Sequence, residues 1–81
     1  MQCHVLFFAQ LAETIGSDRL TIELPEGATV ADALAVLSKA HEAIATTANA
    51  IAVAVNEQYC PAAQVLSDGD TIALIPPVSG G

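Results

Sequence analysis

The residues with the most distinctive chemistry stand at the end of the sequence, which reads IALIPPVSGG and finishes on Gly80 and Gly81. Glycine has no Cβ, so a Gly-Gly end can pass through a narrow channel and leaves the final carboxylate sterically open to attack. Pro76 and Pro77 fix their own φ angles and donate no backbone hydrogen bond, so we expect the last strand to end there. The sequence therefore predicts a flexible tail over 78–81, able to extend by about 13–14 Å, with the Gly81 carboxylate open to attack; the alternative is a frayed terminus.

The other polar residues that are able to do chemistry stand in structural contexts. His41 falls on the apolar stripe of a predicted helix and His4 lies on a predicted strand, so both are interpreted as packed or boundary histidines. Asp68 and Asp70 flank Gly69, a pattern that favours a hairpin turn over a paired-carboxylate site. The sequence contains no Gly-rich phosphate loop, no G-x-S-x-G and no H-E-x-x-H. It predicts neither a self-sufficient active site nor a metal site.

The two cysteines, Cys3 and Cys60, are far apart and lack C-x-x-C or zinc-type spacing. Cys60 precedes Pro61 and has no histidine near it in sequence, which disfavours a catalytic nucleophile. We expect two reduced thiols that pack as small hydrophobes, with a disulfide between them as the less favoured alternative. No bound cofactor is predicted.

The charge is strongly one-sided, since nine acidic residues against two basic ones, Arg19 and Lys39, give a formal net charge of −7. Phosphate backbones and anionic membranes are bound largely by clustered Lys and Arg, so the sequence disfavours both as partners. An acidic domain is better matched to a protein partner with a basic surface. The alternative is that the acidity only keeps the chain soluble.

The length of 81 residues and a hydrophobic content of 53% indicate one folded domain over 1–81 rather than a disordered chain. The first residues, MQCHVLFFAQLAETIG, have no basic n-region, and no segment approaches the roughly 20 apolar residues that a membrane-spanning helix needs. We therefore expect a cytoplasmic protein.

The elements that must position the tail follow from hydrophobic periodicity. The pattern predicts strands at 4–9, 19–24, 51–55 and 58–60, helical segments at 10–16 and 29–44, and an Asp-Gly turn with a final strand within 66–75. The helix at 29–44 has Thr29 as N-cap and Asp32 three residues later as a capping box. Its apolar stripe is Val30, Leu34, Leu37, His41 and Ile44.

This order predicts an α+β fold with a mixed sheet of about five strands and one long helix packed on one face. A ubiquitin-like β-grasp fits best, because its first and last strands lie parallel at the sheet centre and are joined by a crossover that contains the helix. A ferredoxin-like split βαβ is the alternative, although it requires a second substantial helix.

Three stretches carry a specific resemblance: VLFFAQLAETIG near the start, AVN in the middle and LSDGDTIALIPPVSGG at the end. Together they resemble the small, sulfur-carrying subunit of molybdopterin synthase, a ubiquitin-like β-grasp family. The resemblance implies that the Gly81 carboxylate is adenylated, with ATP, by an adenylyltransferase of the ubiquitin-activating type and is then converted to a thiocarboxylate. The resemblance further implies that Gly80 allows the tail to enter the active site of the large synthase subunit, where sulfur would pass to cyclic pyranopterin monophosphate in molybdenum cofactor biosynthesis.

The chain is on this interpretation a non-catalytic sulfur donor, and the sulfurtransferase activity belongs to the complex. Three alternatives stay open. One is a sulfur carrier for thiazole synthesis or tRNA thiolation, another is a ubiquitin-like protein modifier joined through Gly81, and the third is a binding module with an incidental tail.

The strands HVLFFA, IAVAV and TIALI are apolar at nearly every position, a pattern expected when both faces of a sheet are covered. Because one long helix covers one face, we expect the other face to present an apolar patch to a partner. The resemblance implies that this partner is the large subunit, in a heterotetramer of two carriers flanking a dimer, and that Phe7, Tyr59 and Ile75 are contact residues. The alternative for Phe7 is an ordinary core position.

Overall fold

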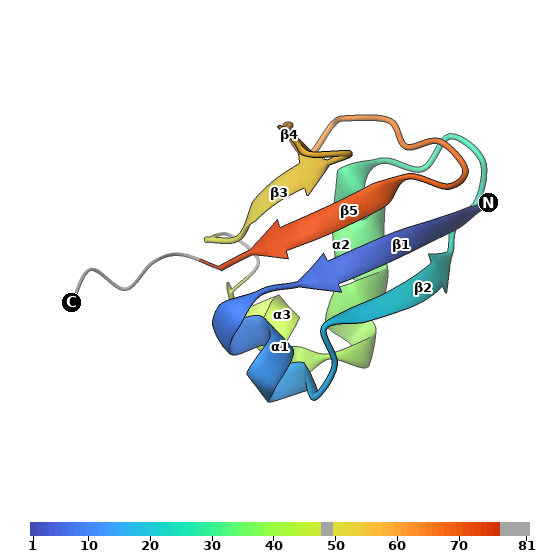
Figure 1. Ribbon diagram of the computed structural model, residues 1–81. Helices are drawn as coiled ribbons and strands as arrows, with labels where there is room; N and C mark the ends of the chain where they lie inside the picture. Colours follow the sequence, from blue (N-terminus) through green and yellow to red (C-terminus); the bar gives the residue numbers. More distant parts are fainter. Residues whose placement is uncertain (48–49, 77–81) are drawn as a thin grey trace.

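Strand β1 (Gln2–Phe7) is an interior strand of a mixed five-stranded sheet in the computed structural model, which describes residues 1–47 and 50–76. It pairs in parallel with the last strand, β5 (Thr71–Ile75), and antiparallel with β2 (Arg19–Glu23). The order across the sheet is β2-β1-β5-β3-β4 (Figure 1). The remaining elements are β3 (Ala52–Val55), β4 (Gln58–Tyr59), α1 (Ala9–Ile15), α2 (Val30–Ala40) and α3 (Glu42–Thr47).

Helices lie behind one face of this sheet, and α2 crosses it diagonally (Figure 1). The β-grasp prediction is confirmed, because β1 and β5 are parallel neighbours and the chain between them contains α2. Side chains alternate along each strand, so every second residue points into the core beneath the helices. From the two central strands the core receives Cys3, Val5, Phe7, Ile72 and Leu74.

The predicted helix at 29–44 is wrong in one respect, since it is two helices. Its N-terminus is as expected: the Thr29 hydroxyl accepts a hydrogen bond from the Asp32 backbone, and the Asp32 carboxylate accepts one from the Thr29 backbone at 2.9 Å. At the other end His41 adopts φ −136° and ψ 108°, which ends α2, and the His41 carbonyl then accepts from the Ile44 N–H to start α3.

The residues of the predicted stripe still face the core. Val30, Leu37 and Ile44 are buried, Leu34 is half-buried and packs against the core, and Ala33 is a further buried residue of α2. His41 is half-buried, and its ring meets the Phe7 ring edge-on with 6.4 Å between centroids. His41 is therefore a boundary histidine, as the sequence predicted.

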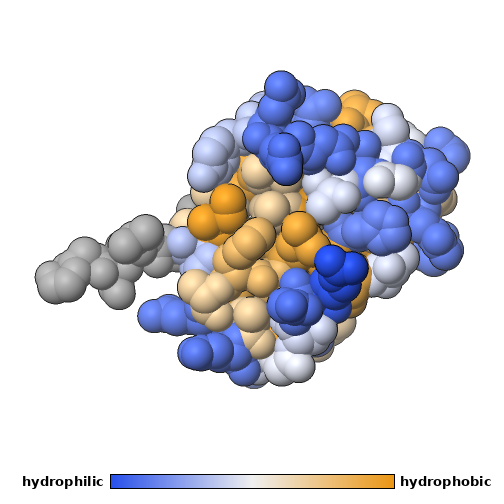
Figure 2. Space-filling view, in the orientation of Figure 1, coloured by the Kyte–Doolittle hydropathy of each residue, from blue (hydrophilic) through white to orange (hydrophobic). Residues whose placement is uncertain are grey.

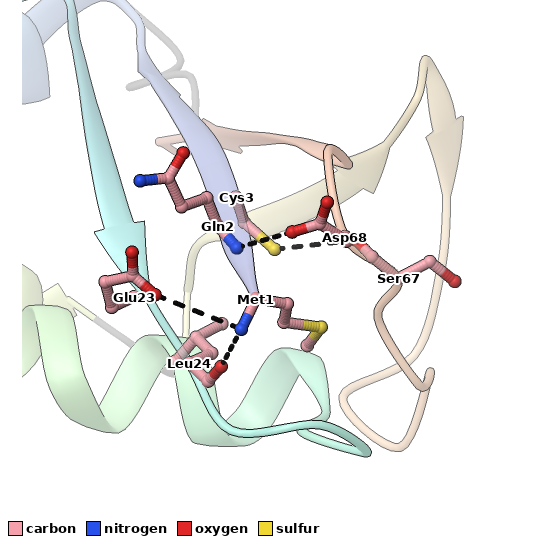
Figure 3. A network of polar contacts seen from close by, with 7 residues as sticks. All are labelled: Met1, Gln2, Cys3, Glu23, Leu24, Ser67 and Asp68. Atoms are coloured by element: carbon pink, nitrogen blue, oxygen red, sulfur yellow. Dashed lines mark hydrogen bonds and ion pairs between the residues drawn. The ribbon is translucent and has the colours of Figure 1, made fainter.

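The end of β1 opposite Phe7 is fixed by a network that joins three segments (Figure 3). The Met1 amino group donates to the Leu24 carbonyl at 2.7 Å, and the Gln2 N–H donates to the Asp68 carboxylate at 2.7 Å. Gly69, with a left-handed φ of 85°, turns its N–H back to the Gln2 carbonyl. Asp68 is a turn residue, as expected, but the turn leads from a loop into the central strand β5 and does not join two paired strands.

Within the described residues, no helix is long and apolar enough to cross a membrane.

Candidate functional site

The face of the sheet that carries no helix, here the open face, is organised by one row of residues that crosses all five strands. Leu6 on β1 is paired with Arg19 on β2 and with Ala73 on β5. Ala73 is in turn paired with Ala54 on β3, and Ala54 with Tyr59 on β4. Paired residues share a face, so these five side chains form a continuous central row.

Two further rows flank the central row. On one side His4 is paired with Thr21 and Thr71, and the His4 Nδ1 lies 3.3 Å from the Thr21 hydroxyl. On the other side Ile75 is paired with Ala52. The open face is thus polar toward the start of β1 and apolar toward the end of β5.

The apolar part is accessible in the isolated chain. Tyr59 is 73% exposed and Phe8, which follows β1 in an extended conformation, is 45% exposed, while Leu6 and Ile75 are half-buried. Figure 2 shows apolar surface gathered over the ends of β1 and β5, with hydrophilic surface around it. A large exposed apolar patch with a polar rim is typical of a protein interaction site.

Two hollows on this face share Leu6 and Thr71 in their lining. One, of about 440 Å³, is lined by Leu6, Phe8, Asn56, Glu57, Thr71 and Ala73. The other, of about 450 Å³, is lined by His4, Leu6, Arg19, Leu20, Thr21 and Thr71. The open face therefore offers recesses that partner side chains can enter.

The turn between β3 and β4 is held against the start of β5 by hydrogen bonds. Asn56 and Glu57 both have left-handed backbones, with φ of 50° and 71°, which is the geometry of a tight two-residue hairpin. The Asn56 side chain accepts from the Thr71 N–H at 3.0 Å and donates to the Asp70 carboxylate at 2.9 Å. This turn fixes where Tyr59 stands on the open face.

The residues that the sequence singled out divide into three groups. Tyr59 and Ile75 lie on the open face as expected, and their role as contact residues stays a prediction. Phe7 is only 2% exposed and packs in the core, which is the alternative that the sequence left open. Gly80, Gly81 and the whole predicted tail over 78–81 lie outside the described residues.

Sequence reasoning missed Phe8 as the accessible phenylalanine of the pair Phe7 and Phe8. The stretch HVLFFA is apolar throughout, so composition alone does not tell which phenylalanine faces outward. The signal lies in the alternation: polar Gln2 and His4 belong to one face, so Leu6 and Phe8 share it while Phe7 points inward.

The cysteines are free, as predicted, and differ in environment. Cys3 is buried, and burial together with the charges of Asp70 and Asp68 raises the pKa of its thiol. The Cys3 thiol is therefore kept in its unreactive protonated form. Cys60 is half-buried at the edge of the sheet. Among the described residues, His, Cys, Asp and Glu form no group of three or more that is suited to a metal ion.

Comparisons with known proteins agree over the whole chain. The model of the ThiS family matches residues 5–81. A protein of Chlamydomonas reinhardtii named molybdopterin synthase sulfur carrier subunit is 40% identical over 83 residues, covering all of both chains. The small archaeal modifier protein 1 of Haloferax volcanii is 37% identical over 82 residues, covering 91% of this chain and 94% of the relative.

Solved structures agree with the architecture. The crystal structure of SAMP1 from Haloferax volcanii matches with a TM-score of 0.86 at 33% identity and covers all of both chains. A complex of subunits 1 and 2 of the molybdopterin-converting factor from Helicobacter pylori contains a chain that matches with a TM-score of 0.71 at 27% identity, again over all of both chains.

Proposed function

This chain belongs to the ThiS family, and from that premise we propose that it is the sulfur carrier subunit of a molybdopterin synthase. The observation that carries the proposal is full-length similarity to a relative with that name, in a chain whose sequence ends in Gly80-Gly81. The open face adds support, because its apolar part reaches Ile75, a short way before the glycines in the sequence. In this proposal the open face of the sheet binds the partner protein, and the Gly80-Gly81 end is thereby presented to it.

The proposed chemistry takes place at the Gly81 carboxylate. A carboxylate oxygen attacks the α-phosphate of ATP, pyrophosphate leaves, and an acyl-adenylate forms. A persulfide donor then attacks the acyl carbon and AMP leaves, after which a second thiol reduces the sulfur–sulfur bond, so that a thiocarboxylate stays on Gly81. Because Gly81 has no side chain, neither attack is hindered.

Two protein partners follow from this chemistry. An adenylyltransferase of the ubiquitin-activating type performs the activation with ATP, and the large synthase subunit receives the loaded tail. The Helicobacter pylori complex supports the second partner, since a chain similar to this one is there assembled with subunit 2. We assign the contact with the large subunit to the open face, with Phe8, Tyr59 and Ile75 in it.

The carrier and the large subunit divide the work. A domain of formal charge −7 repels a phosphorylated pterin, so the groups that bind this substrate are assigned to the large subunit. Gly81 delivers sulfur to cyclic pyranopterin monophosphate there, and hydrolysis of the acyl–sulfur bond returns the carboxylate. The chain is thus a cosubstrate that is reloaded in every cycle.

Intact mass measurement after incubation with ATP, the adenylyltransferase and a sulfur source tests the proposal. We expect a gain that corresponds to one oxygen replaced by sulfur, and fragmentation should place it on Gly81. An unchanged mass, or sulfur located on Cys3 or Cys60, would contradict the proposal.

A second candidate, a ubiquitin-like protein modifier, is favoured by the similarity to the Haloferax volcanii modifier. A modifier forms an isopeptide bond between Gly81 and a lysine of a target protein, whereas a dedicated sulfur donor does not. Searching cell extracts for such conjugates by mass spectrometry separates the two functions.

A further inference from the structure

Arg19 is the basic residue of the open face. It stands at the β2 end of the central row, paired with Leu6, and its side chain is exposed. It lines the hollow that contains His4 and also a smaller one, of about 290 Å³, that contains Phe8 and Asp18. A partner that covers the central row must therefore meet the Arg19 guanidinium.

The Arg19 charge is unpaired within the described part of the chain. The hydrogen bonds of this residue there are made by its backbone with the Ser17 hydroxyl. The ion pair found among residues 1–47 and 50–76 is made by Glu23, at the other end of β2. Its carboxylate lies 3.9 Å from the Met1 amino group. In a chain with nine acidic and two basic residues, a guanidinium left without a carboxylate is available to another molecule.

A carboxylate is the group that suits this position best. The guanidinium presents a planar fork of donors that matches a carboxylate with two parallel hydrogen bonds. Leu6 and Phe8 are its neighbours, so docking removes water from around it and strengthens an ion pair with the partner. The same dehydration penalises a partner that offers no carboxylate, because a buried charge is then left without a counter-charge.

We propose that Arg19 is a specificity residue of the open face, which pairs with an Asp or Glu side chain of the large subunit and so fixes how that partner lies across the central row. This inference rests on the proposed function. Tyr59 stands at the other end of the row, four strand spacings or about 19 Å away. An aromatic contact at Tyr59 and an ion pair at Arg19 together define the orientation of the large subunit along the central row. Apolar contacts alone do not define this orientation.

Two alternative roles of Arg19 predict different results. In the first, the Arg19 charge prevents the edge strand β2 from pairing with another copy of the chain. Removal of the charge then causes self-association. Alternatively, Arg19 acts only through the net charge, in which case any other basic residue has the same effect when removed.

The matched control is Lys39, which lies in the last turn of α2 on the covered side of the sheet. Arg19→Gln and Lys39→Gln each lower the formal charge from −7 by one unit, but only the first removes the proposed ion pair. The experiment measures the dissociation constant of each variant and of Arg19→Glu with the large subunit of the same organism, at low and physiological salt. Size-exclusion chromatography and thermal melting of the free carriers accompany it.

We expect Arg19→Gln to bind about five- to tenfold more weakly and Arg19→Glu more weakly still, since charged hydrogen bonds are worth more than neutral ones. Lys39→Gln should bind as the unmodified chain does or slightly tighter, and all carriers should stay monomeric and melt alike. Arg19→Lys should recover part of the affinity, because it keeps the charge and loses the fork.

Equal affinities of Arg19→Gln and Lys39→Gln would overturn the inference, and so would self-association of Arg19→Gln with unchanged affinity for the large subunit. Failure of the proposed function is distinguishable. In that case the unmodified carrier itself does not bind the large subunit, and Gly81 acquires no sulfur in the mass measurement.

Discussion

Phe7 and Phe8 are neighbours in the sequence, yet they belong to two regions with different tasks. Phe7 lies on the covered face of the sheet, packed with Val5 and Leu74 beneath the helices, and is almost inaccessible. Phe8 lies on the open face with nearly half of its surface exposed. Toward the ends of β1 and β5 the sheet is apolar on both sides, and the side beneath the helices forms the core. The other is available for binding, because one residue of offset in a strand changes the face completely.

The largest expected difference between the faces concerns stability. We expect Phe7→Ala to lower the free energy of unfolding by about 3–5 kcal/mol, because it leaves a cavity in the core. It also removes the edge contact with His41. Denaturant unfolding of the free carrier measures this loss, and affinity for the large subunit per folded molecule should stay the same. A stable Phe7→Ala carrier that binds poorly would reverse our assignment of the two faces.

The converse is expected of Phe8→Ala. Since Phe8 is a large exposed aromatic residue of the apolar patch, its truncation should weaken binding to the large subunit by about 2 kcal/mol. The free energy of unfolding should change much less than in Phe7→Ala. Calorimetric titration against the large subunit gives the affinity, and a binding constant equal to that of the unmodified carrier would place the interface elsewhere.

A change outside both faces should affect stability moderately and binding not at all. Thr29→Ala removes the side-chain cap of α2, for which we expect a loss of about 1 kcal/mol in unfolding free energy. The dissociation constant with the large subunit serves as the control. Weakened binding by this variant would show that the helical side also takes part in the contact.

The smallest effect is a pH dependence from the covered face. The pKa of the Cys3 thiol is raised in the folded chain, so ionisation of this thiol favours the unfolded state. The protonated Cys3 thiol therefore contributes stability that is fully present below its ordinary pKa of 9.0. This contribution is lost as the pH rises through the higher pKa of the folded chain. We expect unfolding free energy to fall more between pH 7 and 10 in the unmodified chain than in Cys3→Ala; parallel curves would contradict this.

Much of the fold is predictable from the sequence, because turns and caps are encoded locally. Gly16 ends α1 with a left-handed φ of 85° and its N–H on the Ala12 carbonyl, as expected from its place after QLAETIG. The capping box at Thr29 and the two-residue turn at Asn56 and Glu57 are likewise predictable. The break at His41 is not, because the apolar periodicity continues through it to Ile44, which is buried in the core.

The candidate site is harder to predict, since it depends on registers between distant strands. The order Arg19, Leu6, Ala73, Ala54, Tyr59 across the sheet is set by four separate strand pairings. Only the pairing of Ala54 with Tyr59 is set by a local turn, and the other three join strands that are distant in the sequence or have a helix between them. Resemblance supplied Tyr59 and Ile75, but the uniform apolarity of HVLFFA concealed the difference between Phe7 and Phe8. No sequence motif marks Arg19 as a residue of the site, because its position depends on the pairing with Leu6.

Sulfur transfer by carriers of altered length tests the central claim most directly. Strand β5 ends at Ile75, six residues before Gly81 in the sequence, and chain termini contribute little to stability, so we expect that removing Gly81, or adding one alanine after it, leaves the melting temperature almost unchanged. Both changes displace the reactive carbon, and we expect them to abolish molybdopterin formation with the large subunit while binding through the open face persists. A carrier without Gly81 that still supports molybdopterin formation would contradict the account.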